Sequence, residues 1–265
     1  MTGAELLSIR AVNGRIAGAK RRLFFIDFDG TLVPIVRRPE LVVFSDRSRE
    51  ALRVLNGRRD TEIAIVSGRP LSFIRRTVRL RGMICAGNHG LEIAGPGVDF
   101  RHPEAVAARP ALLKMKRAWK GLSGAFPGAI VEDKRMSVTF HYRQVRPSLQ
   151  EDARQAAAAA AEMLPAGGLR LTAGKKIVEA RPAVRWGKGD ALRFLFDRWG
   201  YRAGEDLPVV LGDDETDRDM FAVVGGEGLA VHVGHGSAPP EANARVGSPF
   251  SVTSLLEKAA NLPRR

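Results

Sequence analysis

The feature that most limits the fold of this chain is a short apolar run at residues 23–26, which ends at two acids and a glycine. The sequence from residue 22 to residue 34 reads R-L-F-F-I-D-F-D-G-T-L-V-P. A short run with aromatic and β-branched members predicts a fully buried strand of a parallel sheet. Ligands of open α/β sheets bind beside the carboxyl ends of the strands. We therefore expect Asp27 and Asp29 to lie in a functional site.

The close spacing of these two acids also indicates a kind of chemistry. Neighbouring carboxylates repel each other unless a proton or a cation separates them, and a divalent ion such as Mg²⁺ is the simplest cation for oxygen ligands. One aspartate would then be a nucleophile and the other an acid or base, because aspartate forms covalent phosphoryl intermediates. The alternative is a plain turn, which D-x-D alone favours. D-F-D-G-T-L directly after an apolar strand is much more specific.

Alternating apolar runs and helical patterns flank a central region of different character. The pattern predicts a parallel sheet covered by helices on both faces. We expect Asp46 and Ser251 to cap the first and the last of these helices. The expected strands are 23–26, 62–66, 83–86, 207–211 and 229–233, and the expected helices are 46–55, 71–78, 189–199, 217–223 and 251–260.

The central region predicts a separate α+β layer. Residues 102–122 are typical of a helix with Trp119 on its apolar side, and 149–164 are typical of an alanine-rich helix. Residues 129–142 alternate polar and apolar side chains like antiparallel strands, and 169–181 return as strand. We expect a loosely attached lead-in at 1–20, a core at 21–103 and 177–265, and an inserted cap domain at 104–176.

Composition narrows the class of protein. The 265 residues include 42 basic and 29 acidic ones, a net charge of +13 that suits nucleic acid, an anionic lipid surface or a phosphorylated substrate. The basic residues are scattered and are not interleaved with aromatics, so we expect no nucleic-acid partner. No apolar run approaches the roughly 20 residues of a membrane helix, and we see no secretory signal. The single cysteine, Cys85, favours the cytoplasm.

Three further motifs stand at the ends of expected strands or helices. S-G-R-P follows a strand, and the Ser67 hydroxyl with the Gly68 backbone could donate to a phosphoryl oxygen, although a helix cap is the commoner role. W-G-K-G-D-A-L places Lys188 at the start of a helix, where a cation can neutralise a carboxylate and a phosphoryl group. G-D-D-E-T-D-R-D follows another strand. Asp213, directly after that strand, is therefore a better metal ligand than the other acids of this run. We expect Asp214 to order Lys188 or a metal-bound water, with Asp217 in support.

Together these motifs resemble the haloacid-dehalogenase-like phosphohydrolases over about residues 22–260. The resemblance implies an α/β protein with a Rossmann-like parallel-sheet core of that type and an inserted α+β cap domain. It also implies that Asp27 attacks phosphorus while Asp29 acts as acid and then as base. The implied phosphate-binding residues are Asp27, Gly30, Thr31, Ser67, Gly68 and Lys188. The implied Mg²⁺ site comprises Asp27, the Asp29 backbone carbonyl, Asp213 and Asp214.

Several longer segments of the sequence resemble those of the trehalose-6-phosphate phosphatase family. The segments are D-F-D-G-T-L-V-P-I, V-S-G-R-P, G-N-H-G-L-E, V-E-D-K-x-x-S-V-T-F-H-Y-R, V-E-A-R-P and G-D-D-E-T-D-R-D-M-F. Related sugar-phosphate phosphatases usually carry G-D-x-x-N-D, where this chain has Thr216 and Asp217. Carboxylates and a lysine suit the hydroxyls of a disaccharide. The sugar-binding residues that the resemblance implies are Asn88, His89, Glu132, Lys134, Ser137, His141 and Glu179.

Two alternatives stay open. The same chemistry could act on another sugar phosphate, such as sucrose-6-phosphate or mannosyl-phosphoglycerate, because the cap carries selectivity. A non-catalytic basic module, binding nucleic acid or regulating a synthase, would be expected to lack at least one of Asp27, Asp29, Lys188 and Asp213, and all four are present. We see no glycosyltransferase domain before the core, and therefore expect functional pairing with a separate trehalose-6-phosphate synthase.

Overall fold

The computed structural model of this chain describes residues 6–36, 41–163 and 168–263. The chain divides into two compact units. The core unit is Met1–Asp99 with Trp186–Arg265, and the inserted unit is Phe100–Arg185. The expected cap range of 104–176 lies within the inserted unit, which extends further at both ends. Residues 1–5 of the expected lead-in and Leu164 of an expected helix lie outside the described residues.

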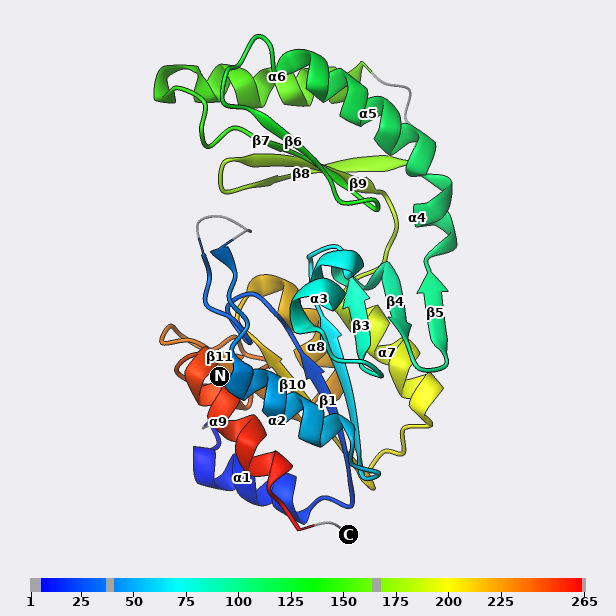
Figure 1. Cartoon of the computed structure of the whole chain (residues 1–265), viewed down its shortest axis with the longest axis vertical. Coiled ribbons are helices and arrows are strands. Elements are labelled where there is room, and N and C mark those ends of the chain that lie inside the picture. The colour runs from blue at the N-terminus through cyan, green and yellow to red at the C-terminus, as the bar shows by residue number, and fades with distance from the viewer. Residues whose placement is uncertain (1–5, 37–40, 164–167, 264–265) are drawn as a thin grey trace. The chain divides into compact units, whose positions relative to one another are not determined.

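An eight-stranded sheet of order β12-β11-β10-β1-β2-β3-β4-β5 forms the centre of the fold (Figure 1). The strands from β12 to β3 pair in parallel, whereas β3 and β4 are antiparallel. The expected α/β fold class is confirmed, although the sequence did not predict β4, β5 or β12. The strands are β1 (Arg21–Ile26), β2 (Thr61–Val66), β3 (Ile84–Gly87), β4 (Glu92–Gly95), β5 (Val98–Arg101), β10 (Asp206–Gly212), β11 (Leu229–Val233) and β12 (Ala244–Val246).

Strand β1 lies where the chain changes direction in the sheet. The chain passes from β1 to β2 on one side and later returns to β10 on the other side. Residue Ile26, the last of β1, is in register with Ile65 of β2 and with Leu211 of β10. Because the three strands are parallel, the residues that follow them meet at one edge, which is the usual ligand-binding position of such sheets.

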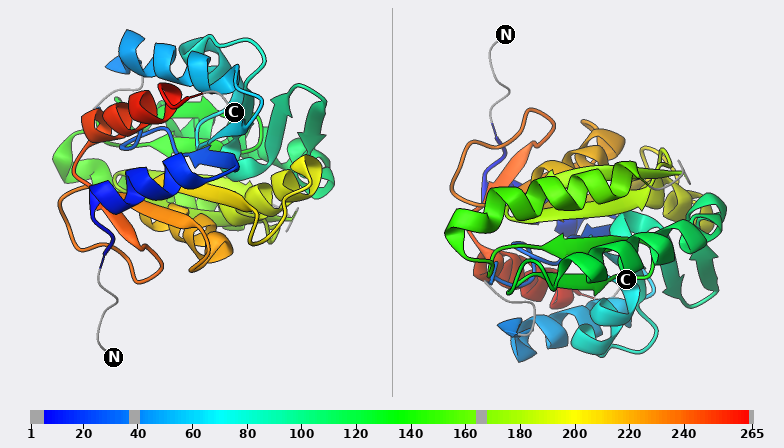
Figure 2. Two further views of the ribbon diagram at one scale, coloured as in Figure 1. Left: turned by 90° about the horizontal axis from the view of Figure 1, so that it is seen from below. Right: turned by 90° about the horizontal axis from the view of Figure 1, so that it is seen from above.

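Helices cover both faces of this sheet, as Figure 2 shows. Phe24 and Ile26 of β1 point into the core formed with α1 (Ile9–Gly18), α2 (Asp46–Asn56), α3 (Leu71–Val78) and α9 (Pro249–Ala260). Phe25 points the opposite way, and its ring centroid lies 5.4 Å from that of Phe196 in α7 (Lys188–Trp199). Helix α8 (Arg218–Val224) packs beside α7. Because successive side chains of β1 point to opposite faces of the sheet, this strand contributes to the apolar layers on both sides.

Three expectations about helix ends and attachment were wrong. Helix α1 is firmly packed rather than loosely attached, because Val12 and Ile16 are buried and Arg22 Nε donates to the Ile16 carbonyl at 2.6 Å. The side chains that cap α2 and α9 are those of Ser45 and Ser248, not of Asp46 and Ser251.

The inserted unit has a four-stranded antiparallel sheet of order β6-β7-β9-β8. Val138, Phe140, Val178 and Ala180 pack with the buried Trp119 against the helices, so the other face of the sheet carries polar side chains. Helices α5 and α6 lie side by side (Figure 2). The elements are α4 (Pro103–Ala107), α5 (Arg109–Leu122), α6 (Gln150–Glu162), β6 (Ile130–Asp133), β7 (Val138–His141), β8 (Leu169–Gly174) and β9 (Ile177–Pro182).

Two expected elements of this unit are each divided. The expected strand 169–181 is a hairpin of β8 and β9, and the expected helix 102–122 is interrupted at Ala108. Among the described residues, none of the helices combines the length and the apolar character that crossing a membrane requires.

Candidate active site

Three strand ends bring the predicted functional residues of the core unit together. Asp27 follows β1, Ser67 follows β2 and Asp213 follows β10. The Asp27 backbone N–H donates to the Leu211 carbonyl at 2.9 Å, which ties the ends of β1 and β10 together. Gly30 has a φ of 83°, and a Cβ there would overlap the Asp213 carboxylate. Glycine therefore permits both the turn and the approach of Asp213.

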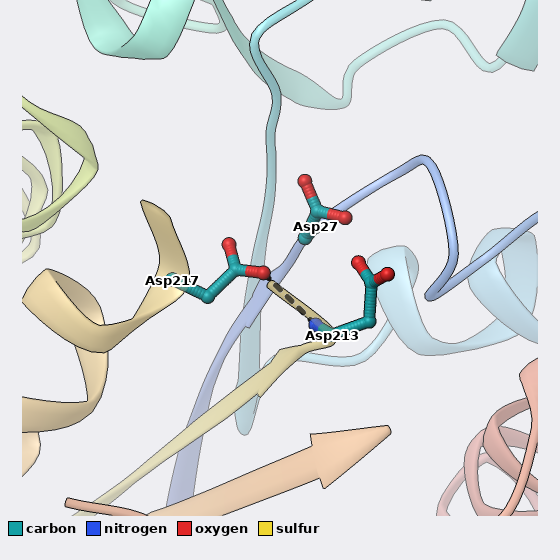
Figure 3. A group of neighbouring side chains, drawn as sticks. All are labelled: Asp27, Asp213 and Asp217. Carbon is teal, nitrogen blue, oxygen red and sulfur yellow. Dashed lines mark hydrogen bonds between the residues drawn. The ribbon is translucent and has the colours of Figure 1, made fainter. Parts of the chain in front are cut away.

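Three carboxylates and one ammonium group occupy this edge of the sheet. Carboxylate oxygens of Asp27, Asp213 and Asp217 lie within 4.8 Å of one another (Figure 3). Lys188 Nζ donates to Asp27 Oδ1 and to Asp217 Oδ1, each at 2.7 Å. Asp27, Asp217 and Lys188 are all buried. One positive charge thus faces three negative ones.

This imbalance shifts the acid–base behaviour of the cluster. Burial raises the pKa of Asp213 to about 7, and the charges of Asp217 and Asp214 add to the effect. Burial also raises the pKa of Asp27 well above its ordinary value, although Lys188 opposes the rise. Burial disfavours the charge on Lys188, but Asp27 and Asp217 outweigh it and raise the pKa of the lysine. Hard oxygen donors with excess negative charge fit a divalent cation such as Mg²⁺.

Asp217 uses both of its carboxylate oxygens inside this cluster. Oδ1 accepts from Lys188, whereas Oδ2 accepts the backbone N–H of Asp213 at 2.9 Å (Figure 3) and that of Asp214 at 3.1 Å. Asp217 therefore fixes the loop that carries Asp213. From the sequence, Asp214 was expected to order Lys188 or a metal-bound water, with Asp217 only in support. The Asp214 carboxylate instead accepts from the Thr216 backbone N–H at 2.9 Å and the Thr216 hydroxyl at 2.7 Å.

The Asp29 carboxylate does not join the acidic cluster. Arg69 Nε donates to Asp29 Oδ2 and Arg69 Nη2 donates to Asp29 Oδ1, each at 2.7 Å. This planar, two-bond contact is the strongest form of an arginine–carboxylate pair. The S-G-R-P motif contains Arg69 but does not predict this contact. Only the position of the motif after β2, level with β1, could have indicated it.

Two hydroxyl groups lie at the same edge of the sheet. Ser67 is buried, and its Oγ accepts from the Arg69 backbone N–H at 3.1 Å, which leaves the hydroxyl proton available for donation. Thr31 is also buried, and its Oγ1 has no hydrogen-bond partner among the described residues. Buried hydroxyls are normally bonded, so both fit a site that receives an acceptor such as a phosphoryl oxygen.

The G-N-H-G loop lies directly beside the S-G-R loop. The backbone N–H of Asn88 donates to the Arg69 carbonyl at 2.8 Å, and that of His89 donates to the Ser67 carbonyl at 2.9 Å. A Cβ on Gly68 would come within 2.7 Å of the His89 ring. Asn88 Nδ2 donates to buried Glu92 at 2.7 Å. The core unit thus places Asn88 and His89 next to Ser67.

In the inserted unit, Glu179 is the centre of a second polar cluster. Its Oε1 accepts from Lys134 Nζ at 3.0 Å, Ser137 Oγ at 2.8 Å and Thr139 Oγ1 at 3.1 Å. Burial works against the charge, but Lys134 and these hydrogen bonds outweigh it and lower the pKa of Glu179 to about 2. Thr139 was missed from the sequence, although the alternation of β7 places it on the face of Ser137 and His141.

The other two expected residues of this sheet pair with each other. His141 Nε2 lies 2.9 Å from Glu132 Oε2. Glu132 is in register with Thr139, and Thr139 with Glu179, so these side chains share the polar face. The inserted unit therefore brings together all five residues that the resemblance implied for it, namely Glu132, Lys134, Ser137, His141 and Glu179.

An aspartate follows the central strand of the parallel sheet, and a buried lysine contacts it. The fold is that of haloacid-dehalogenase-like hydrolases. A haloacid dehalogenase-like hydrolase from Bacteroides thetaiotaomicron has this fold, with a TM-score of 0.63 and 16% identity over 90% of this chain and 99% of that one. Residues 25–247 match the trehalose-phosphatase family. The chain belongs to that family.

Individual relatives agree with this assignment. A trehalose-phosphate phosphatase of Mycobacterium tuberculosis is 35% identical over 91% of this chain and 62% of its own length. The C-terminal domain of the trehalose-6-phosphate phosphatase of Candida albicans has a TM-score of 0.77 and 25% identity over 98% of this chain and 99% of that one. This chain spans between 19% and 62% of the length of the mycobacterial relatives.

Proposed function

We propose that this protein is a Mg²⁺-dependent phosphatase that converts trehalose 6-phosphate into trehalose and phosphate through a phosphorylated Asp27. The observation that carries the proposal is the buried Lys188, bonded to Asp27 and Asp217 at the strand edge where ligands bind. A nucleophilic carboxylate next to a cation suits a dianionic phosphoryl group. Membership of the trehalose-phosphatase family supports the substrate.

The reaction would occur in two half-reactions. Asp27 attacks phosphorus, the bond to the sugar oxygen breaks, and Asp29 gives its proton to that oxygen. Water then attacks phosphorus, Asp29 takes a proton from the water, and the bond to Asp27 breaks to release phosphate. A residue that donates in one step and accepts in the next is general acid–base catalysis.

Neighbouring groups would stabilise the transferred phosphoryl group. Lys188, the hydroxyls of Ser67 and Thr31, and the backbone N–H group of Gly68 would donate to its oxygens. Gly30, which the resemblance implied for phosphate binding, is not a backbone donor here, because its N–H already donates to the Val33 carbonyl at 2.7 Å. Asp27, the Asp29 backbone carbonyl, Asp213 and Asp214 would hold Mg²⁺, which when bound supplies charge neutralisation and polarises the phosphoryl group.

The polar face of the inserted unit would recognise the sugar. Glu179 already accepts three hydrogen bonds at Oε1, so Lys134 and Ser137 are held in place for a polyhydroxylated ligand. Glu132 and His141 would contact further hydroxyls, as would Asn88 and His89 of the core unit. We also assign the protein to the cytoplasm, because Cys85 is a buried free thiol. A separate synthase would supply the substrate.

Phosphate release in the presence of Mg²⁺ tests this proposal. We expect release from trehalose 6-phosphate and little from sucrose 6-phosphate, glucose 6-phosphate or mannosyl-phosphoglycerate. The isosteric Asp27→Asn variant should lose turnover and fail to retain ³²P after acid quenching. Turnover of a different sugar phosphate would keep the mechanism and remove the substrate. No release from any of them, together with salt-sensitive binding to duplex DNA, would refute catalysis.

A further inference from the structure

Both oxygens of the Asp29 carboxylate accept hydrogen bonds from Arg69, so the carboxylate group is not free to rotate. Both bonds measure 2.7 Å, and the two side chains are partly exposed, at 19% for Arg69 and 32% for Asp29. A partly exposed carboxylate without a partner samples several rotamers, whereas a two-bond guanidinium contact selects one orientation. The Asp29 carboxylate therefore owes its orientation to Arg69.

Arg69 is itself held in place from three directions. Its guanidinium carbon lies 4.7 Å from the centre of the Phe73 ring, and such stacking restricts the arginine plane. Its backbone N–H donates to Ser67 Oγ at 3.1 Å, and its carbonyl accepts from the Asn88 N–H at 2.8 Å. The arginine thus links the S-G-R loop, the G-N-H-G loop and Asp29.

We propose that Arg69 is a positioning residue for catalysis, which fixes the Asp29 carboxylate in the orientation needed for proton transfer. This inference rests on the proposed function, because it requires Asp29 to be the acid and the base. Arg69 forms no bond to the reacting phosphorus. It acts only through the carboxylate that it orients.

The two half-reactions place the same demand on Asp29. Its oxygen must give a proton to the departing sugar oxygen as the phosphorus–oxygen bond breaks, and must take one back from water as the bond to Asp27 breaks. Proton transfer needs donor and acceptor within hydrogen-bond reach in both steps. A misplacement of about 1 Å costs about 100-fold in rate. We therefore expect Arg69→Ala to lower kcat by about 10- to 100-fold while KM stays within about twofold.

Chemical rescue and a matched control distinguish positioning from simple structural support. Guanidinium ion at millimolar concentration should restore part of the kcat of Arg69→Ala, and Arg69→Lys should retain more activity than Arg69→Ala. Arg76 provides the control, because its guanidinium carbon lies 5.9 Å from the same Phe73 ring. Its side chain is exposed, and among the described residues the ion pair of Asp29 is with Arg69. Arg76→Ala should behave like the wild type.

Measurements in the Asp29→Asn variant test whether Arg69 binds the phosphoryl group directly. With p-nitrophenyl phosphate, whose leaving group needs no proton, Asp29→Asn enzyme should still release a burst of p-nitrophenolate. If Arg69 acts only through Asp29, adding Arg69→Ala to that background leaves the burst rate unchanged. A slower burst, or a higher inhibition constant for inorganic phosphate in Arg69→Ala, would show that Arg69 binds phosphate and would overturn the inference. Wild-type turnover in the same assay tests the proposed function separately.

Discussion

The substitution Asp217→Asn tests whether one buried carboxylate supports the whole catalytic loop. It keeps the size of the side chain and replaces one acceptor oxygen by a donor NH₂ group. In the wild type, one oxygen faces the Lys188 ammonium group and the other faces the N–H groups of Asp213 and Asp214. Every one of these partners is a donor. Whichever way the amide is turned, its NH₂ group must face a donor.

The expected cost follows from burial. Asp217 is fully buried, so a donor left without an acceptor costs about 1–3 kcal/mol. Lys188 keeps its bond to Asp27, so its charge is still paired in the variant. We therefore expect the free energy of unfolding to fall by about 1–3 kcal/mol. In a protein of this size each kcal/mol lowers Tm by about 2–4 °C, so Tm should fall by about 2–12 °C. Activity should fall too, because the loop that carries Asp213 loses its anchor.

Urea denaturation followed by circular dichroism, in metal-free buffer, would measure this cost. The matched control is Asp219→Asn, which makes the same substitution two residues away on an exposed side chain. Surface substitutions usually stay within about 0.5 kcal/mol of the wild type. A loss of less than about 1 kcal/mol in Asp217→Asn would refute the claim that both Asp217 oxygens are needed as acceptors for buried donors.

Three further outcomes follow from the same structure. In Glu179→Gln we expect KM for trehalose 6-phosphate to rise about 10- to 100-fold, because a charged acceptor is lost. Turnover of p-nitrophenyl phosphate, which has no sugar, should be unaffected. Equal losses for both substrates would contradict this prediction. Hydrogen bonds from Arg58, opposed by burial and reinforced by Arg22, lower the pKa of Asp60 from 3.8 to about 2. Asp60→Asn should therefore cost about 2 kcal/mol at neutral pH, and the gap from the wild type in denaturation curves should close as the pH falls from about 4 to about 2. Because the pKa of Asp213 is raised to about 7, Mg²⁺ must displace a proton at lower pH, and its affinity should fall by up to about tenfold per pH unit below about 7. Calorimetric titration in two buffers would detect the released proton, and an affinity that is constant between about pH 5.5 and 7 would count against the shift.

The core of the fold could be predicted because each buried element is continuous in the sequence. Helix Leu71–Val78 and strand Leu229–Val233 have the bounds that their patterns predicted. Strands Glu92–Gly95 and Ala244–Val246 were missed, since each is short and contains charged or glycine residues. They form strands because an adjacent strand of the sheet pairs with them, and a local sequence pattern does not reveal such pairing.

The candidate site could be predicted in its positions but not in its pairings. Parallel strands whose carboxyl ends meet place Asp27, Ser67 and Asp213 together, and that much follows from apolar runs alone. The acidic run from 213 to 219 does not say which member contacts Lys188. That choice depends on how α8 packs beside α7, which only the folded chain determines.

The distribution of cations over the site gives each carboxylate a different environment. Lys188 bonds to Asp27 and Asp217, and Arg69 bonds to Asp29. Among the described residues, Asp213 is the one member of the acidic triad that no ion pair or side-chain donor contacts, and its pKa is raised to about 7. Negative charge that the protein leaves uncompensated marks the position where a cation lowers the free energy most. We therefore expect a cation to bind on the Asp213 side of Asp27, whereas the contact with Arg69 holds the Asp29 carboxylate apart from the acidic triad.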